Sequence, residues 1–183
     1  MPVLSASAQA EALSIAREAL EKYLVSGKVE RLRPKNQDLN QVLGCFVTLK
    51  KNQELRGCIG QFEPNIPLYQ LIQRMAITAA TQDPRFPPVT SDELTTIKIE
   101  ISIMTPKKKI SDWQKIKLGK EGVVIQKGPH AGTFLPQVAT ETGWSLEEFL
   151  SHLCWDKAGL PVDVYKDPSA SLYTFEAQVF EEK

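Results

Sequence analysis

The feature that most constrains the fold is a strict alternation of residue types between positions 97 and 104. Isoleucine occupies positions 97, 99, 101 and 103, and the residues between them are Lys98, Glu100, Ser102 and Met104. A period of two is typical of a β-strand with one buried and one hydrated face, because successive side chains of a strand point to opposite sides. The segment therefore predicts a strand of an antiparallel sheet, the kind of sheet that commonly has one wet face.

Further strands are expected as hairpins. Residues 44–49 and 55–62 read as two strands joined by a turn at 50–54, and residues 122–126 and 133–135 as two strands around a glycine- and proline-rich loop at 127–132. A last strand is expected at 172–180. The predicted sheet is thus built mainly from neighbouring segments.

Three segments have the apolar spacing and the end signals of helices. The first follows Ser7 as its N-cap and ends at Gly27, and the second begins at Pro67 and continues to Ala80. The third starts at a capping box formed by Ser145 and Glu148, and Gly159 ends it. Hairpins separated by helices, without repeated strand-helix-strand units, predict an α+β fold.

Size and charge narrow the class of protein. The chain of 183 residues fits one domain, or two small lobes that share a core. Its 22 basic and 22 acidic residues balance, so no overall field draws it to nucleic acid or to an anionic membrane. The first seven residues lack the features of a signal peptide, and no apolar run approaches the ~20 residues that span a bilayer, so we expect a cytoplasmic protein.

The segment Leu55-Arg56-Gly57-Cys58-Ile59-Gly60 is the first candidate site. Alternation along a strand would place Arg56 and Cys58 on one face, where the guanidinium would favour the thiolate, and glycines in strands often mark the close approach of a ligand or of backbone. The other interpretation is packing, because cysteine is often buried and glycine also occurs in bulges. The residues alone leave both open.

Two further segments carry candidate binding residues. In Asp83-Pro84-Arg85-Phe86, Arg85 could bind an anion on a stiff loop, or it could pair internally with Asp83. In Leu135-Pro136-Gln137-Val138-Ala139, which we expect to end a strand and begin a turn, Gln137 could point its amide into a pocket or make a structural hydrogen bond.

Other residue patterns carry weaker indications. The lysines at 107–109, 115, 117 and 120, with Trp113 among them, could bind RNA, although a solvated loop is the favoured interpretation. Two histidines and three scattered cysteines form no metal-binding spacing, so no metal site is predicted and no cofactor is identified. The odd cysteine count favours reduced thiols.

The sequence resembles the AMMECR-type domain family, component A of the AmmeMemoRadiSam system. The resemblance rests on the six-residue segment 55–60, on Asp83–Phe86, on Leu135–Ala139 and on Cys154-x-x-Lys157-Ala158-Gly159-Leu160, and it covers nearly all of residues 1–183 as a single domain. It implies two α+β lobes, each with an antiparallel sheet and packed helices, and a cleft between them that the six-residue segment faces. It also implies a Memo-type protein and a radical-SAM protein as companions.

The resemblance makes Arg56, Gly57, Cys58 and Gly60 expected site residues, with Asp83, Arg85 and Gln137 as neighbours. Two main hypotheses follow. In the first, Cys58, activated by Arg56, is the nucleophile or carrier of an enzyme or group-transfer component acting on a small or nucleotide-derived substrate. In the second, the protein is a non-catalytic adaptor that binds a ligand or a protein, and RNA binding is a third, less favoured reading.

Overall fold

The computed structural model describes residues 3–30 and 32–183, and its contacts divide the chain into two compact units. Unit 1 comprises residues 1–104 and 178–183, and unit 2 comprises residues 105–177. Both contain helices and antiparallel strands, which confirms the α+β class. The segment from which we argued against a signal peptide includes Met1 and Pro2, which lie outside the described residues.

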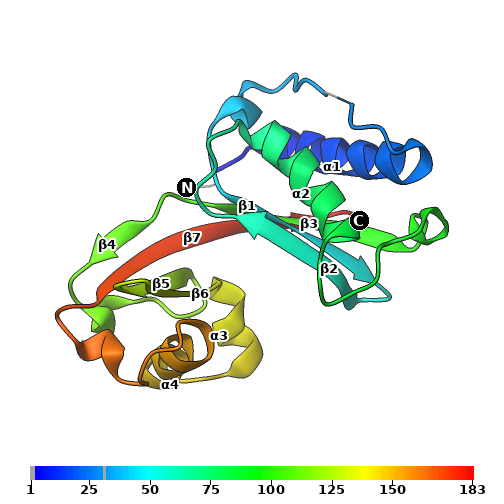
Figure 1. The fold of residues 1–183 in the computed structure, drawn as a ribbon. Helices are drawn as coiled ribbons and strands as arrows, with labels where there is room; N and C mark the ends of the chain where they lie inside the picture. The colour runs from blue at the N-terminus through cyan, green and yellow to red at the C-terminus, as the bar shows by residue number, and fades with distance from the viewer. Residues whose placement is uncertain (1–2, 31) are drawn as a thin grey trace. The chain divides into compact units, whose positions relative to one another are not determined.

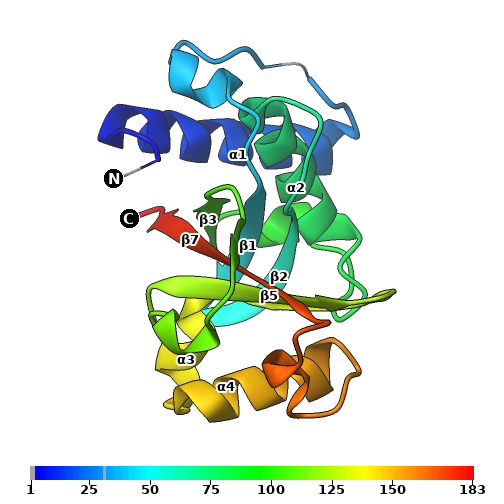
Figure 2. The same cartoon turned by 90° about the vertical axis from the view of Figure 1, so that its left-hand side faces the viewer.

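Unit 1 is a sheet covered on one face by two helices. Its strands follow the order β2 (Glu54–Gln61), β1 (Cys45–Lys51) and β3 (Ile97–Met104), and β7 (Ser171–Glu181) adjoins β3. The helices α1 (Ala6–Ser26) and α2 (Leu68–Thr81) lie on the same side of these strands in both ribbon views (Figures 1 and 2). All four alternating isoleucines are buried in the core of this unit, as their spacing predicts. The hydrated face is confirmed only at Lys98, which is exposed, and partly at Glu100, whereas Ser102 and Met104 are buried.

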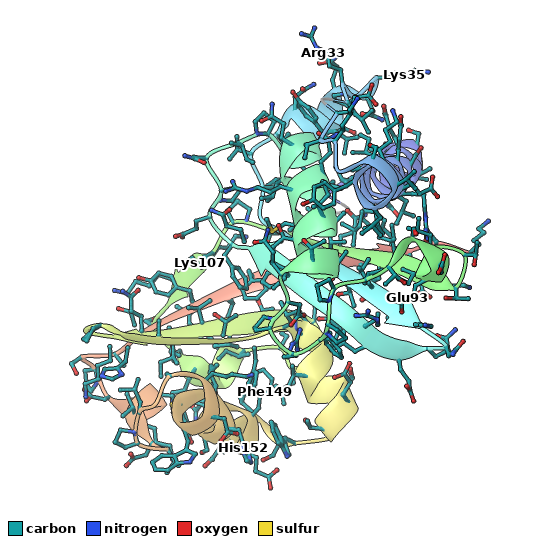
Figure 3. The ribbon with its side chains drawn as sticks, turned by 45° about the vertical axis from the view of Figure 1, so that its right-hand side comes forward. Arg33, Lys35, Glu93, Lys107, Phe149 and His152 are labelled. Carbon is teal, nitrogen blue, oxygen red and sulfur yellow. The ribbon has the colours of Figure 1, made fainter. Side chains whose placement is uncertain are left out.

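Unit 2 is a smaller sheet with its own helices. The strands follow the order β4 (Lys108–Ile110), β7, β5 (Glu121–Lys127) and β6 (His130–Phe134). The helices are α3 (Pro136–Thr142) and α4 (Leu146–His152), and Phe149, buried completely, is directed from α4 into the core of the unit (Figure 3). A π-helical turn at Leu153–Lys157 follows α4.

Several helices begin or end at the predicted residue, and others begin one or two residues away from it. Gly27 adopts the left-handed conformation that ends α1, with φ of 69°, and Ser145 with Glu148 forms the expected capping box of α4. The N-cap of α1 is Ser5 and not Ser7: the hydroxyl of Ser5 accepts the N–H of Ala8. Pro67 lies one position before α2 and not at its first residue.

In unit 2 the structure corrects three predictions and confirms one. The loop expected at 127–132 is a tight turn at Gly128 and Pro129, so His130 begins β6. The turn expected at 135–139 forms the start of helix α3, with Leu135 as its N-cap. The helix expected to end at Gly159 is confirmed: α4 continues without a break into the π-helical turn, and Gly159 follows with a positive φ of 64°. Lys108–Ile110, expected in a loop, pairs with β7 as β4.

The π-helical turn has a packing partner that explains its position. A Cβ atom added to Gly132 of β6 would lie 2.7 Å from the backbone nitrogen of Ala158 and 2.8 Å from Cβ of Lys157. The backbone of the turn therefore rests directly on β6 where the strand has no side chain. Within the described residues, no helix has the length and apolar character needed to cross a membrane.

Candidate functional site

The six-residue segment lies on β2, the edge strand of the unit 1 sheet. The β1–β2 hairpin turns at Asn52 and Gln53, which both have positive φ, as the tightest hairpin turns require. Cys58 lies opposite Thr48 of β1, and Gly57 lies opposite Leu49. Because β2 is an edge strand, alternate backbone groups face away from β1 and must find other partners.

A β-bulge changes the direction of Arg56. Leu49 pairs with Gly57 and the next residue, Lys50, pairs with Leu55, so Arg56 is the extra residue of the bulge. The thiol of Cys58 contacts Thr48, whereas Arg56 contacts Glu93, which Lys51 also binds. The expectation that Arg56 and Cys58 share one face is therefore wrong, because the bulge interrupts the alternation on which it rested.

The guanidinium of Arg56 makes three hydrogen bonds with the segment that follows α2. Its Nε and Nη2 donate to the two carboxylate oxygens of Glu93 at 3.0 and 2.9 Å, and its Nη1 donates to the carbonyl oxygen of Pro87 at 2.9 Å. Glu93, which Figure 3 labels, is only 16% exposed, and the hydrogen bonds from Arg56 and Lys51 lower its pKa to about 2. Such a fork-to-fork pair holds both side chains in one geometry.

The thiol of Cys58 is partly buried, and its surroundings favour the protonated form. Burial raises its pKa, an effect that outweighs the opposing influence of the Thr48 hydroxyl, 3.1 Å from Sγ, and of the positive charge of Arg85. Arg56 is not among the groups that shift this pKa. The charged groups that act on the thiol are Arg85, Asp83 and Glu100, and the catalytic roles of Cys58 and Arg56 stay predictions.

Asp83 and Arg85 form the internal pair that was one of the two predicted alternatives. Nε and Nη2 of Arg85 donate to the carboxylate of Asp83 at 2.9 and 2.7 Å, and the same carboxylate accepts the backbone N–H of Cys58 at 2.9 Å. Nη2 of Arg85 also lies 3.3 Å from the carbonyl oxygen of Cys58. The pair thus satisfies both outward-facing backbone groups of Cys58 on the strand edge.

The environment of Asp83 fixes its charge. Asp83 is 4% exposed, and the hydrogen bond from Arg85 lowers its pKa far below the ordinary value of 3.8. The side chain of Arg85 remains 54% exposed, and its guanidinium carbon lies 5.5 Å from the centre of the Phe86 ring. Arg85 is therefore paired with Asp83 and still exposes about half of its side chain to solvent.

The two glycines of the segment are explained by packing within unit 1. A Cβ on Gly57 would lie 2.2 Å from the carbonyl oxygen of Ala79 in α2, and a Cβ on Gly60 would lie 2.2 Å from the ring of Phe46 and 2.5 Å from the carbonyl oxygen of Cys45. Of the two predicted reasons for these glycines, close approach of a ligand or of the protein itself, the second accounts for both. Substrate contact at Gly57 and Gly60 stays a prediction.

Gln137 lies in unit 2, near the start of α3. Its Oε1 atom is buried and has no hydrogen-bond partner among the described residues. The structure therefore does not supply the structural hydrogen bond that was the alternative to a binding role. The predicted contribution of Gln137 to a substrate site remains a prediction, as does the cleft between lobes.

Two residues that contact the six-residue segment, Thr48 and Glu93, were not identified from the sequence. Thr48, which contacts the thiol, becomes visible only through the β1–β2 register. Glu93 had a local signal, since Thr90 and Glu93 form a capping box at the short helix Ser91–Glu93. That signal predicts the helix start but not the long-range pair with Arg56.

The remaining candidate patterns are metal ligands, the two other cysteines and the lysine cluster. Among the described residues, no three histidine, cysteine, aspartate or glutamate side chains come together as metal ligands. Cys45 and Cys154 are buried, unlike Cys58. In the lysine cluster, Lys115 pairs with Asp112 at 3.6 Å and Lys120 with Glu176 at 3.5 Å.

Known proteins are similar to this chain in sequence and in fold over most of their length. The profile of the AMMECR1 family matches residues 13–180. Protein MK0488 of Methanopyrus kandleri is 48% identical over 178 residues, which cover 92% of this chain and 86% of that protein. Protein MJ0810 of Methanocaldococcus jannaschii is 45% identical over 179 residues, which cover 93% of this chain and 88% of that protein.

A solved structure gives the same result for the fold. The crystal structure of the uncharacterized protein PH0010 from Pyrococcus horikoshii matches with a TM-score of 0.85 at 40% sequence identity, over 94% of this chain and 90% of that chain. The family predicted from the four sequence motifs is thus confirmed by profile, by sequence identity and by structure. The chain belongs to the AMMECR1 family.

Proposed function

We propose that this AMMECR1-family protein is a non-catalytic binding module, in which β2 holds the loop at 83–93 in a fixed form for recognition by a partner protein. The observation that carries the proposal is the engagement of both arginines. Arg56 is bound by Glu93 and Pro87, and Arg85 by Asp83, so each already has a carboxylate partner. Each guanidinium is thus already compensated by a carboxylate, so an anionic substrate would gain less from binding either arginine than from binding an unpaired one.

The state of Cys58 supports the same proposal. A nucleophilic cysteine needs a thiolate, and burial raises the pKa of this thiol. Two carboxylates, Asp83 and Glu100, raise it further. In the arrangement described here, Cys58 contributes its backbone groups to Asp83 and Arg85, and its side chain is the small group that fits beside Thr48.

The loop has properties that suit recognition. Pro84, Pro87 and Pro88 are exposed, and the side chain of Arg85 is about half exposed beside the Phe86 ring. Prolines restrict the backbone, and anchors at Cys58 and Arg56 fix the loop at two points. A preordered loop loses little conformational entropy on binding. The partners implied by the family resemblance, a Memo-type protein and a radical-SAM protein, are the proposed recipients.

The test is a binding titration of the full chain with purified Memo-type and radical-SAM proteins from the same organism. Arg56→Ala releases the loop from β2 and should weaken binding about tenfold, which corresponds to roughly 1.4 kcal/mol. Arg74→Ala, which removes an exposed arginine of α2, is the matched control and should leave affinity unchanged. Cys58→Ser should retain binding within about twofold.

Each outcome has a definite meaning once circular dichroism shows that the variants are folded. Unchanged affinity in Arg56→Ala, or binding of neither partner by the wild-type protein, would overturn the proposal. Loss of binding in Cys58→Ser alone would show that the thiol, and not the loop at 83–93, is needed for partner binding.

One observation favours a second function, that of a thiol-dependent group-transfer component. The Thr48 hydroxyl lies 3.1 Å from Sγ of Cys58 and, with the charge of Arg85, lowers the thiol pKa against the effect of burial. These groups would stabilise a thiolate acting on a small or nucleotide-derived substrate. In this case iodoacetamide would label Cys58 in the native protein before Cys45 and Cys154, and equal or absent labelling of the three would exclude it.

A further inference from the structure

Unit 2 contains a cavity that none of the predicted site residues lines. Its volume is about 610 Å³, and three chain segments form it: residues 109–113, residues 165–168 and residues 170–172 of β7 and its approach. This volume lies within the range of about 300–1,000 Å³ that is common for small-molecule sites. All of its lining residues belong to unit 2, so the cavity is defined by that unit alone.

An aromatic pair and aliphatic side chains supply the apolar lining. The rings of Trp113 and Tyr165 meet edge to face, with centroids 5.1 Å apart and planes at 81°. Tyr165 is 5% exposed, whereas Trp113 is only partly buried. The buried tyrosine thus fixes the orientation of a tryptophan that still offers ring surface to the cavity. Ile110 and Leu172, which pair across β4 and β7, extend this surface.

The charged groups around the cavity leave an excess of positive charge. Lys109 is exposed and has no ion pair within residues 3–30 and 32–183. Lys166 lies 5.2 Å from the ring centre of Tyr165 and 5.8 Å from that of Trp113, and its Nζ is 3.5 Å from a carboxylate oxygen of Glu147. Glu147 offsets the charge of Lys166, so Lys109 supplies the unpaired positive charge. The one acidic residue of the lining, Asp167, is 2.6 Å from Nζ of Lys127, which neutralises it.

From this combination we propose that the cavity binds a small planar anion, an aromatic ring that carries a phosphate or carboxylate group. The ring would lie against Trp113 and the aliphatic surface, and the anionic group would face Lys109 and Lys166. Both contacts are needed, because an exposed lysine pair alone gives little specificity and a single ring surface gives little affinity. None of the residues that line this cavity belongs to the loop at 83–93 that is proposed above for protein recognition.

The test uses the full chain and four probes: phenyl phosphate, inorganic phosphate, benzyl alcohol and adenosine monophosphate. Binding is followed by amide chemical shifts in nuclear magnetic resonance spectra. Phenyl phosphate should bind saturably and shift residues 109–113 and 165–172, at least about tenfold more tightly than inorganic phosphate or benzyl alcohol. If adenosine monophosphate binds more tightly than phenyl phosphate, the ring is a nucleobase; if it binds more weakly, the ring is a simple aryl group.

Substitutions then test whether Lys109 contacts the anionic group of the ligand and whether Trp113 contacts its ring. Lys109→Ala should weaken phenyl phosphate binding at least about threefold, whereas Lys108→Ala, which removes the neighbouring lysine of β4 that does not line the cavity, should not. Trp113→Phe retains an aromatic ring and should weaken binding less than Trp113→Leu. Shifts elsewhere in the protein, equal affinity for all probes, or equal effects of Lys109→Ala and Lys108→Ala would each overturn the proposal.

Discussion

The carboxylate of Asp83 accepts the backbone N–H of Cys58 at 2.9 Å across 25 positions of sequence. This hydrogen bond joins two of the motifs by which the family was predicted, the segment 55–60 and the segment 83–86. Asp83 is in turn held by Arg85, so an ion pair with a buried carboxylate and a half-exposed guanidinium closes the edge of β2 where an open strand would otherwise expose its backbone. The two motifs are thus parts of one structural unit.

Removing the Asp83 carboxylate should destabilise the protein strongly. Asp83→Ala would leave the Cys58 N–H and the Arg85 guanidinium without their acceptor; because Arg85 is about half exposed, the main cost is the unsatisfied Cys58 N–H, about 1–3 kcal/mol. We expect a large decrease in the urea midpoint. Asp92→Ala, in the exposed part of the same loop, is the control and should change the free energy of unfolding by less than about 0.5 kcal/mol. Equal effects of the two substitutions would contradict the assignment.

The Arg56–Glu93 pair predicts how stability depends on pH. The pKa of Glu93 falls from 4.5 to about 2 on folding, so the folded state binds its proton less readily than the unfolded state does. Stability from this pair is therefore present above pH 4.5 and is lost as the pH falls toward 2. Asp83, whose pKa is also lowered, acts in the same direction.

The measurement is the urea midpoint between pH 6 and pH 2. Glu93→Gln removes the titrating group, so it should lower the midpoint at pH 6 and reduce its decline in acid. Glu141→Gln, an exposed position of α3, should reproduce the wild-type curve. A Glu93→Gln curve that runs parallel to the wild-type curve would show that another group controls the acid transition.

Glycine 57 should be intolerant of even the smallest side chain. In Gly57→Ala, the new Cβ would lie 2.2 Å from the carbonyl oxygen of Ala79, so β2 and α2 would have to move apart. We expect a loss of about 1–3 kcal/mol, as for overpacked cores, measured by thermal unfolding. Gly128→Ala is the control: nothing lies within 4 Å of its added Cβ, and only its positive φ of 59° opposes the change, at a cost of about 1 kcal/mol. A smaller effect at Gly57 than at Gly128 would disprove the close approach.

The Thr48 hydroxyl should govern the titration of the Cys58 thiol. Because it stabilises the thiolate, Thr48→Val should raise the pKa of Cys58 further and slow its alkylation at pH 8. The rate of iodoacetamide labelling, measured as a function of pH by mass spectrometry of the Cys58 peptide, reports the change. An unchanged profile would mean that the hydroxyl does not donate to the sulfur. Cys45, whose pKa burial raises strongly, should stay unlabelled in both proteins.

The sequence by itself determined the features that local pattern encodes. The period of two at 97–104 placed four isoleucines in the core, Gly27 ended α1, and Ser145 with Glu148 started α4. The β1–β2 hairpin and the family were also predicted correctly. In each case the signal is a spacing or a cap within a few residues, where the backbone geometry alone dictates which residue types fit.

Only the tertiary structure decided which partners the site residues take. A bulge of one residue turned Arg56 away from Cys58, Glu93 came from 37 positions later in the chain to bind it, and Asp83 closed the strand edge. Strand β4 formed because β7 offered it a partner, although its three residues carry no local strand signal. A charged side chain or a short edge segment can satisfy its bonds in many ways, and the choice among them depends on which distant segments the fold brings within hydrogen-bonding distance.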